Sequence, residues 1–168
     1  MRITIGLLIL LLCPSGVLAA GPNAPINCQV WANFSSRGSI GETVLEEIRK
    51  VRSKLSLALF GINNQVIAEE LAKLAGQGIT VRIKVDKDRT MKKRYRRVVD
   101  LLKAAGIQVL SVGIEGKNHN KFAVIDEAKV LTGSYNWTYR AEQNWENLLV
   151  LTCPELAKMY EREWEAIR

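Results

Sequence analysis

The sequence predicts an α/β fold: one domain built on a mixed β-sheet with helices packed against it. Strand-like and helical segments alternate up to residue 112, which is typical of crossover connections between parallel strands. After residue 121 the strand-like segments follow one another closely, as antiparallel neighbours do. A chain of 168 residues with 48% hydrophobic residues suits one globular domain and excludes a disordered protein.

The first elements expected are a strand, a helix and a second strand. Residues 28–34 (CQVWANF) are typical of a strand. Ser39, followed three residues later by Glu42, is a capping-box pair that predicts the start of a helix. The apolar residues of this helix recur at helical spacing: Val44, Leu45, Ile48 and Val51. The short apolar segment 55–60 (LSLALF) predicts the second strand.

The middle of the chain continues this alternation. A helix is expected at about residues 65–75, with three buried residues: Val66, Leu71 and Leu74. Residues 79–86 (ITVRIKVD) alternate in polarity and predict a strand. Its two faces carry Ile79, Val81, Ile83 and Val85 on one side, and Thr80, Arg82 and Lys84 on the other. A helix over about residues 92–105 and a strand at 107–112 follow.

The last third of the chain predicts three strands and a helix. The strands are expected at residues 121–126 (KFAVID), 129–133 (KVLTG) and 147–152 (NLLVLT). The final helix follows Pro154. One face of this helix is expected to carry Leu156, Met159, Tyr160, Trp164 and Ile167.

The N-terminal residues have the layout of a secretory signal peptide. Arg2 precedes an apolar run over residues 3–13, a break follows, and small residues lead up to position 20. We therefore expect residues 1–20 to be the signal and residues 21–168 the folded domain, exported to the periplasm or secreted. The membrane is then a partner only transiently, during export. A retained anchor is the weaker interpretation, because a span needs about 20 apolar residues.

Export would leave two cysteines in the domain, Cys28 and Cys153. In an oxidising compartment they can pair with each other, and the alternative is two separate buried thiols. The sequence leaves both open. Two cysteines and one histidine do not make an ordinary four-ligand zinc site, so no metal or other cofactor is expected.

The only histidine of the chain, His119, lies in the segment KNHNKFAVID. Residues of equal parity share a face of an extended strand, so His119 and Lys121 are expected to project together. Asp126 has the opposite parity, which favours a structural role in the following turn. A lone histidine is more often an ordinary surface or core residue, but the pattern around this one favours catalysis.

Three further polar residues follow at strand ends: Ser134, Asn136 and Glu146. Taken singly, the first two are turn formers and the third is a solvated carboxylate. Taken together with an imidazole and a lysine, they suit phosphate chemistry without a metal. Imidazole is a nucleophile near neutral pH, lysine neutralises phosphoryl oxygens, and a hydroxyl and a carboxamide donate hydrogen bonds to them. A carboxylate can orient the imidazole.

The segment HNKFAVID (119–126), followed by GSYN (133–136), resembles the HxKxxxxD and GSxN motifs of the phospholipase D superfamily. The resemblance extends from residue 28 to the last helix, and it is closest to the small exported bacterial endonucleases of that group. It implies a single phospholipase D-like domain with a mixed sheet flanked by helices. The catalytic set that it implies comprises His119, Lys121, Asp126, Ser134, Asn136 and Glu146.

The resemblance also implies a mechanism and an assembly. In this superfamily one histidine attacks phosphorus to form a phosphohistidine, and a histidine of a second motif protonates the leaving oxygen. Larger members carry both motifs in one chain, whereas this chain has one histidine. An active enzyme of this type is therefore expected to be a homodimer with its site on the two-fold axis. No metal is required by this mechanism.

A dense basic run, DKDRTMKKRYRRV, precedes and enters the helix expected at 92–105. The chain as a whole has a net charge of +7, which favours a partner that carries phosphate. Cations at a helix start are disfavoured by the helix dipole, so a polyanion is a reason to keep them there. The residues expected to bind nucleic acid are Lys92, Lys93, Arg94, Arg96 and Arg97. Tyr95 and Trp137 are interpreted as aromatic rings that stack on bases.

Three functions fit these observations. The first is a phosphodiesterase or endonuclease that cleaves DNA or RNA with little sequence preference. The second is a phospholipase D built on the same pocket, since a basic patch also binds anionic lipid headgroups. No long apolar loop offers a lipid groove, which ranks it lower. The third is a non-catalytic nucleic-acid-binding protein, and the intact catalytic set argues against it.

Overall fold

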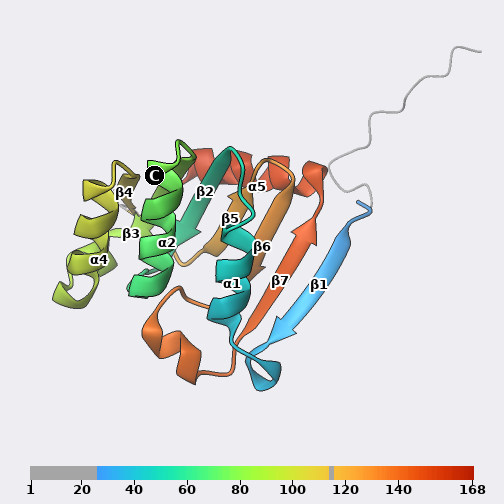
Figure 1. Cartoon of the computed structure of the whole chain (residues 1–168), viewed down its shortest axis with the longest axis horizontal. Coiled ribbons are helices and arrows are strands. Elements are labelled where there is room, and N and C mark those ends of the chain that lie inside the picture. Colours follow the sequence, from blue (N-terminus) through green and yellow to red (C-terminus); the bar gives the residue numbers. More distant parts are fainter. Residues whose placement is uncertain (1–25, 114–115) are drawn as a thin grey trace, which may run out of the picture.

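The computed structural model describes residues 26–113 and 116–168, which contain a seven-stranded mixed sheet (Figure 1). The predicted signal segment, residues 1–20, lies outside the described residues. The strands, in chain order, are β1 (Gln29–Phe34), β2 (Lys54–Leu59), β3 (Thr80–Asp86), β4 (Gln108–Val112), β5 (Lys121–Ile125), β6 (Lys129–Gly133) and β7 (Asn147–Thr152). The helices are α1 (Ile40–Ile48), α2 (Gln65–Gly76), α3 (Lys87–Thr90), α4 (Lys93–Ala104) and α5 (Pro154–Ala166), with 3-10 turns η1 (Ser35–Arg37) and η2 (Tyr139–Gln143).

The strand order is β1-β7-β6-β5-β2-β3-β4, and it divides the sheet into two halves. Strands β2, β3 and β4 run parallel, and α2 and α4 make the crossovers between them. The remaining neighbours pair antiparallel, and short turns join β5 to β6. This arrangement confirms the predicted mixed sheet, and it follows from the change in spacing near residue 121.

Helices cover both faces of the sheet (Figure 1). Helices α1, α2 and α4 bury the larger apolar cluster against one face, and α5 covers a smaller cluster on the other. The alternation predicted for β3 is confirmed, because Val81, Ile83 and Val85 lie in the larger cluster. The opposite face of β3 is partly covered by α5, beneath which Lys84 is only 5% exposed.

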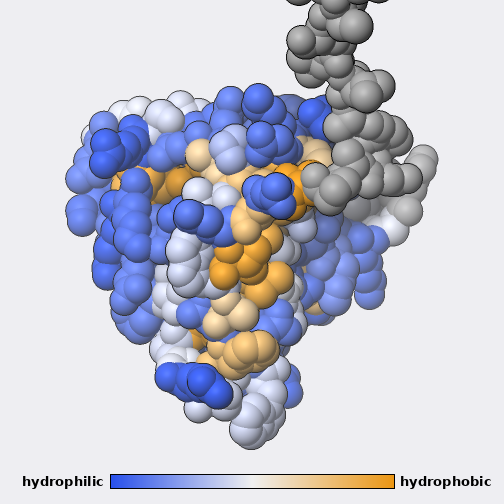
Figure 2. Space-filling model, turned by 90° about the vertical axis from the view of Figure 1, so that its right-hand side faces the viewer, coloured by the Kyte–Doolittle hydropathy of each residue, from blue (hydrophilic) through white to orange (hydrophobic). Residues whose placement is uncertain are grey.

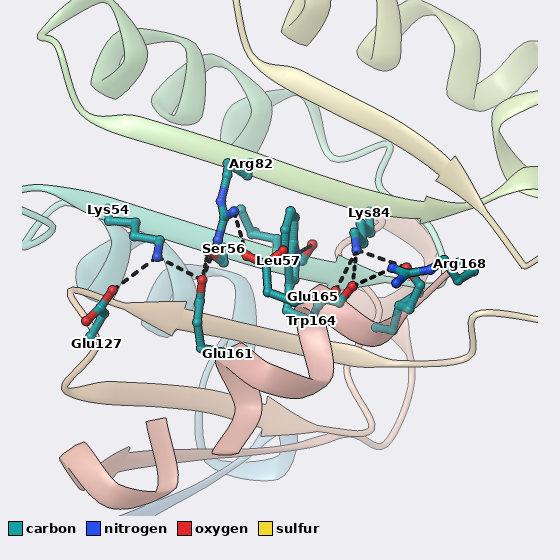
Figure 3. Close-up of polar contacts among 11 residues, drawn as sticks. Lys54, Ser56, Leu57, Arg82, Lys84, Glu127, Glu161, Trp164, Glu165 and Arg168 are labelled. Carbon is teal, nitrogen blue, oxygen red and sulfur yellow. Dashed lines mark hydrogen bonds and ion pairs between the residues drawn. The ribbon is translucent and has the colours of Figure 1, made fainter. Parts of the chain in front are cut away.

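Helix α5 is fixed to the sheet by side chains of β3 (Figure 3). Lys84 Nζ donates hydrogen bonds to the carbonyl oxygens of Trp164, at 2.6 Å, and Ile167, at 2.9 Å. These carbonyls are at the C-terminal end of the helix, where a cation also interacts favourably with the helix dipole. Arg82 forms an ion pair with Glu165, with 2.8 Å between Nη1 and Oε1. The polar side of β3 therefore serves to dock α5.

Strand β1 is an edge strand, hydrogen-bonded along one side to β7. Its apolar side chains Val30, Trp31 and Phe34 are all about half exposed. Figure 2, which faces the right-hand side of Figure 1, shows an apolar stripe among hydrophilic residues there. Cys28, directly before β1, forms a disulfide with Cys153, the N-cap residue of α5. The structure thus pairs the two cysteines and ties the edge strand to the last helix.

Two predicted helix faces were partly wrong. Val66 is 51% exposed, because the buried stripe of α2 is made of Ile67, Ala68, Leu71 and Leu74. Met159 is 43% exposed on the flank of α5, whose buried residues are Ala157 and Trp164. The predicted N-cap of α1 is confirmed, since the Ser39 hydroxyl accepts a hydrogen bond from the backbone N–H of Glu42.

No helix within residues 26–113 and 116–168 has the length and apolar character that a membrane crossing demands.

Candidate active site

His119 lies in the loop that enters β5, and this loop is fixed by its neighbour Asn118. Asn118 is 4% exposed, and its carboxamide donates to the carbonyl oxygens of Leu59, at 3.4 Å, and Lys84, at 3.3 Å. Its backbone N–H donates to Oδ2 of the fully buried Asp86 at 3.1 Å. Leu59 and Asp86 end β2 and β3, so the histidine loop is held at the carboxyl ends of parallel strands. This is the usual position of ligand sites in open α/β sheets.

An aromatic ring supports the imidazole. The Phe60 ring, one residue past β2, lies 4.4 Å from the His119 ring between centroids, with the two planes tilted by 54°. The guanidinium of Arg89 lies 3.9 Å from the centroid of the same Phe60 ring, and Lys121 Nζ lies 5.4 Å from it. Such cation–π contacts hold a cation near a ring without a carboxylate partner. The Phe60 ring thus contacts the imidazole of His119 and lies near the cationic groups of Arg89 and Lys121.

Four of the six predicted catalytic residues line one cavity of about 530 Å³: His119, Lys121, Ser134 and Asn136. His119 lies just before β5 and Lys121 is its first residue, and the other two follow β6, its antiparallel neighbour. Gly133, directly before Ser134, lets the end of β6 lie close to β7, because a Cβ at that position would lie 2.3 Å from the carbonyl oxygen of Asn147. The shared parity of His119 and Lys121 is therefore confirmed.

The electrostatics of the cavity favour a neutral imidazole. Lys121 Nζ lies 3.2 Å from His119 Nδ1 and donates to the His119 carbonyl oxygen at 2.6 Å. Burial, and then the charges of Lys121, Arg89 and Lys117, lower the pKa of His119 below its ordinary 6.5. Burial also lowers the pKa of Lys121, although the Glu146 carboxylate opposes this. A neutral imidazole with a free lone pair is the form that can act as a nucleophile.

Glu146 reaches the cavity through Ser134. One of its carboxylate oxygens accepts a hydrogen bond from the Ser134 hydroxyl, and the other accepts one from the Asn144 carboxamide at 3.1 Å. The Ser35 hydroxyl accepts a hydrogen bond from the backbone N–H of Glu146 at 2.8 Å, and this contact fixes Glu146 from a second side. Within the described residues Glu146 does not hydrogen-bond to His119 of its own chain. It therefore holds the serine hydroxyl in place in this structure.

Residues 44–168 match the family described as "Cardiolipin synthase, PLD-like domain". The chain belongs to the PLD-like domain family. The mitochondrial cardiolipin hydrolase of Mus musculus is 34% identical over 158 residues, which cover 92% of this chain and 70% of the relative. The enzyme of the same description from Canis lupus familiaris is 32% identical over 158 residues, with coverages of 94% and 60%. A phospholipase D of Rickettsia prowazekii is 30% identical over 135 residues, with coverages of 78% and 63%. The chain thus spans less than two thirds of the length of these last two relatives.

Solved structures share the fold of this PLD-like domain. The phospholipase D family member Nuc from Salmonella typhimurium superposes with a TM-score of 0.79 at 23% identity, covering 84% of this chain and 97% of its own. NucT from Helicobacter pylori gives 0.74 at 21% identity, covering 84% and 96%. Almost the whole length of each neighbour is therefore matched by this one domain, as the resemblance seen in the sequence implied.

Asp126 lies outside the cavity lined by His119, at the opposite end of β5 from Lys121. Its carboxylate accepts backbone hydrogen bonds from Arg52, Ser53 and Lys54, at 2.9 to 3.0 Å, and one from the Ser53 hydroxyl at 2.8 Å. Burial by itself would raise the pKa of Asp126, but these hydrogen bonds outweigh it and lower the pKa. The motif aspartate thus anchors the start of β2, as its parity suggested.

The basic run forms α3 and the first turns of α4, and all five residues expected to bind nucleic acid are exposed: Lys92, Lys93, Arg94, Arg96 and Arg97. The prediction that Tyr95 and Trp137 stack on bases was wrong. Tyr95 is 6% exposed and Trp137 is 1% exposed, so neither offers a face to a base. Tyr95 shares the buried stripe of α4 with Val98, Val99 and Leu102, a helical spacing that the sequence contained.

Several site residues were missed by reasoning from the sequence. Asn118 and Asp86 fix the histidine loop, and no motif marks them. The Phe60 ring packs against the imidazole of His119, but in the sequence Phe60 looks like the last residue of an apolar strand. Trp145, directly before Glu146, is 87% exposed, which makes it an aromatic ring available to a partner near the site. The sequence did contain a signal for the exposure of Trp145, namely its position inside a polar segment between two strands.

Proposed function

We propose that this protein is a phosphodiester hydrolase that cleaves DNA or RNA with little sequence preference, through a phosphohistidine, in a site shared by two identical chains. One observation carries the proposal. His119, Lys121, Ser134 and Asn136 line a single cavity, yet the chain contains one imidazole in all. The two-histidine chemistry implied by the family therefore needs a second copy of the chain.

In the proposed reaction, the neutral imidazole of His119 attacks phosphorus and the bond from phosphorus to the leaving oxygen breaks. His119 of the partner subunit, protonated at that moment, gives its proton to the leaving oxygen. Water then attacks the phosphohistidine, the phosphorus–nitrogen bond breaks, and the partner's His119 takes the proton from water. Lys121, Ser134 and Asn136 would stabilise the non-bridging oxygens. A bound phosphate would give Lys121 Nζ an oxygen as its hydrogen-bond acceptor, in place of His119 Nδ1.

The shared site is tested by mixing subunits. Wild-type chain is unfolded and refolded together with increasing amounts of His119→Ala, and hydrolysis is measured at constant total protein. If each site needs both histidines, activity falls with the square of the wild-type fraction. A linear fall would show that each chain works alone and would end the proposal of a shared site. Full activity of purified His119→Ala by itself would end the assignment of His119 as the nucleophile. Sedimentation of the wild type and of His119→Ala establishes that dimers are compared.

The substrate class is tested by offering plasmid DNA, RNA, phosphatidylcholine and cardiolipin vesicles side by side, with and without excess chelator. Nucleic acid is favoured by the exposed basic residues of α4 and by the exposed Trp145. Lipid is the second candidate, favoured by relatives described as cardiolipin hydrolases and phospholipases D. Cleavage of vesicles without cleavage of either nucleic acid would select it. Cleavage that survives the chelator is expected for this mechanism.

We also propose that the protein is exported. The layout of residues 1–20 supports this, and so does the disulfide between Cys28 and Cys153, since disulfides persist in oxidising compartments. Fractionation of cells that produce the full-length chain tests the proposal. The expected result is a processed protein in the periplasm or medium, and an unprocessed protein in the cytosol would contradict it.

A further inference from the structure

A second cavity, of about 290 Å³, adjoins the catalytic one, and the two share Asn136. Three arginines line it, Arg89 from α3, Arg94 from α4 and Arg140 from η2, together with the carboxamide of Asn144. No carboxylate lines this arginine cavity. Its walls bring together residues 60–63, 89–95 and 136–144, which are far apart in the chain, and the last two of these segments contribute the cations.

The three guanidinium groups have no carboxylate partners in the part of the chain that the structure describes, where the ion-paired arginines are Arg49 and Arg82. Arg89 is instead placed by aromatic rings, over Phe60 at 3.9 Å and with its Nη1 donating to the Tyr95 hydroxyl at 3.4 Å. Like charges that converge without a counter-charge repel one another, and a bound anion relieves this repulsion.

The packing of Tyr95 indicates that the arginine cavity is built rather than accidental. A Cβ at position 61 would lie 2.9 Å from the Tyr95 ring, so glycine there lets the ring pack directly on the backbone that leaves β2. This contact brings the first turn of α4, with Arg94, next to the loop that carries Phe60. The cation is thus positioned by a buried residue of its own helix.

We propose that the arginine cavity binds the phosphate next to the scissile phosphodiester on the same nucleic-acid strand. This inference rests on the proposed function and deepens it. Guanidinium groups are matched to phosphate oxygens in geometry and charge, and the shared Asn136 places the two cavities side by side. The polar lining does not suit an acyl chain. Trp145, 87% exposed beside Asn144, offers a face on which the intervening or following base stacks.

The experiment uses three thymidine dinucleotides that each contain one diester: TpT, pTpT with a 5′ phosphate, and TpTp with a 3′ phosphate. For the wild-type protein we expect kcat/KM for one of the two phosphorylated forms to exceed that for TpT tenfold or more. In the double variant Arg94→Gln, Arg140→Gln this preference should fall below threefold. The matched control is Lys158→Gln, Arg162→Gln, which removes two exposed cations from α5 and should keep the preference.

The possible results separate the inference from the proposed function. Equal rates for all three dinucleotides in the wild type, or a preference that survives in the arginine variant, overturn the inference alone. Failure to cleave any dinucleotide or longer strand, with cleavage of cardiolipin vesicles, overturns the nucleic-acid assignment and the inference together. Circular dichroism of each variant checks that the exposed substitutions leave the fold intact.

Discussion

The carboxylate of Asp86 accepts a hydrogen bond from the backbone N–H of Asn118, with 3.1 Å between Oδ2 and nitrogen. Its other oxygen accepts the backbone N–H of Asp88 at 3.1 Å, at the start of the short helix that carries Arg89. One fully buried carboxylate therefore fixes both the loop that presents His119 and the helix that presents a cation over Phe60. Asp86 is a positioning residue for both cavities.

Replacing Asp86 with asparagine should lower kcat at least tenfold, because one of the two backbone hydrogen bonds loses its acceptor and the histidine loop shifts. Loss of a hydrogen bond to a buried charged group costs about 1.5–3 kcal/mol of unfolding free energy. Since the Asp86 charge raises the pKa of His119, the variant should show a pKa of His119 lower than the wild type. Asp100→Asn, on an exposed part of α4, is the control. An unchanged kcat in a folded Asp86→Asn variant would contradict the positioning role.

The pKa of His119 is directly measurable, because it is the only histidine and gives one imidazole signal in a proton NMR titration. The midpoint is expected below 6.5, since burial and then Lys121 and Arg89 disfavour the imidazolium. Lys121→Met should raise the midpoint. The folded pKa is depressed, so the unfolded chain binds more protons near it, and the folded state loses stability as pH falls through this range. A wild-type midpoint above 6.5 would refute the account.

Asp126 should matter for stability more than for chemistry. Asp126→Asn removes the charge from an acceptor of four hydrogen bonds, and about 1.5–3 kcal/mol of unfolding free energy should be lost. The folded pKa is lowered, so this stability is present above the unfolded pKa of about 4 and disappears as pH falls through the folded pKa. Urea titrations at several pH values measure it, with Asp100→Asn as the control. Activity per folded molecule that falls a hundredfold would instead place Asp126 in the chemistry.

The disulfide should contribute strongly to stability because it joins residues 125 positions apart. Closure of so long a loop corresponds to about 2–5 kcal/mol in the chain-entropy account. The double variant Cys28→Ser, Cys153→Ser should therefore unfold at lower urea concentration than the oxidised wild type. Reductant should destabilise the wild type to a similar degree and leave the double variant unchanged. A wild type that is indifferent to reductant would mean that the bridge does not stabilise the fold.

The exposed cations of α4 should determine the salt dependence of nucleic-acid binding. Reversing Lys93, Arg94 and Arg97 removes up to three phosphate contacts, so the slope of log affinity against log salt should become shallower by about 2 for a single strand. The catalytic variant His119→Ala provides the background, so that binding is measured without cleavage. The matched control reverses three exposed cations outside the basic run: Lys103 in the last turn of α4, and Lys158 and Arg162 on α5. Equal slopes in the two triple variants would remove the basic run from the binding surface.

Much of this fold was predictable because its signals are local. The two-residue alternation of β3 and the helical spacing of α1 follow from the order of polar and apolar residues in single segments. Val66 and Tyr95 show where such signals were misjudged. Val66 lies five residues before Leu71 and therefore on another side of α2, and Tyr95 was assigned to a ligand although its helical spacing placed it in the core.

The gathering of His119, Lys121, Ser134 and Asn136 around one cavity was predictable, because these residues lie close together in the sequence at the ends of two neighbouring strands. The supporting contacts were not, because they join residues that only the sheet brings together. Asp86 reaches Asn118 across 32 positions, and the Phe60 ring meets His119 across 59. The arginine cavity likewise depends on η2 lying beside α3 and α4, which no pattern within one segment records.

The pairing of β1 with β7 constrains how the polypeptide acquires its structure as it is synthesised. The strand that emerges first must wait for the partner that emerges nearly last, so the exposed apolar residues of β1 stay unpaired through most of translation or translocation. Cys28 likewise cannot form its bond to Cys153 until residue 153 has appeared. Oxidation and closure of the sheet edge are therefore late, post-translational events, and a chaperone that shields an unpaired strand would assist this protein during that interval.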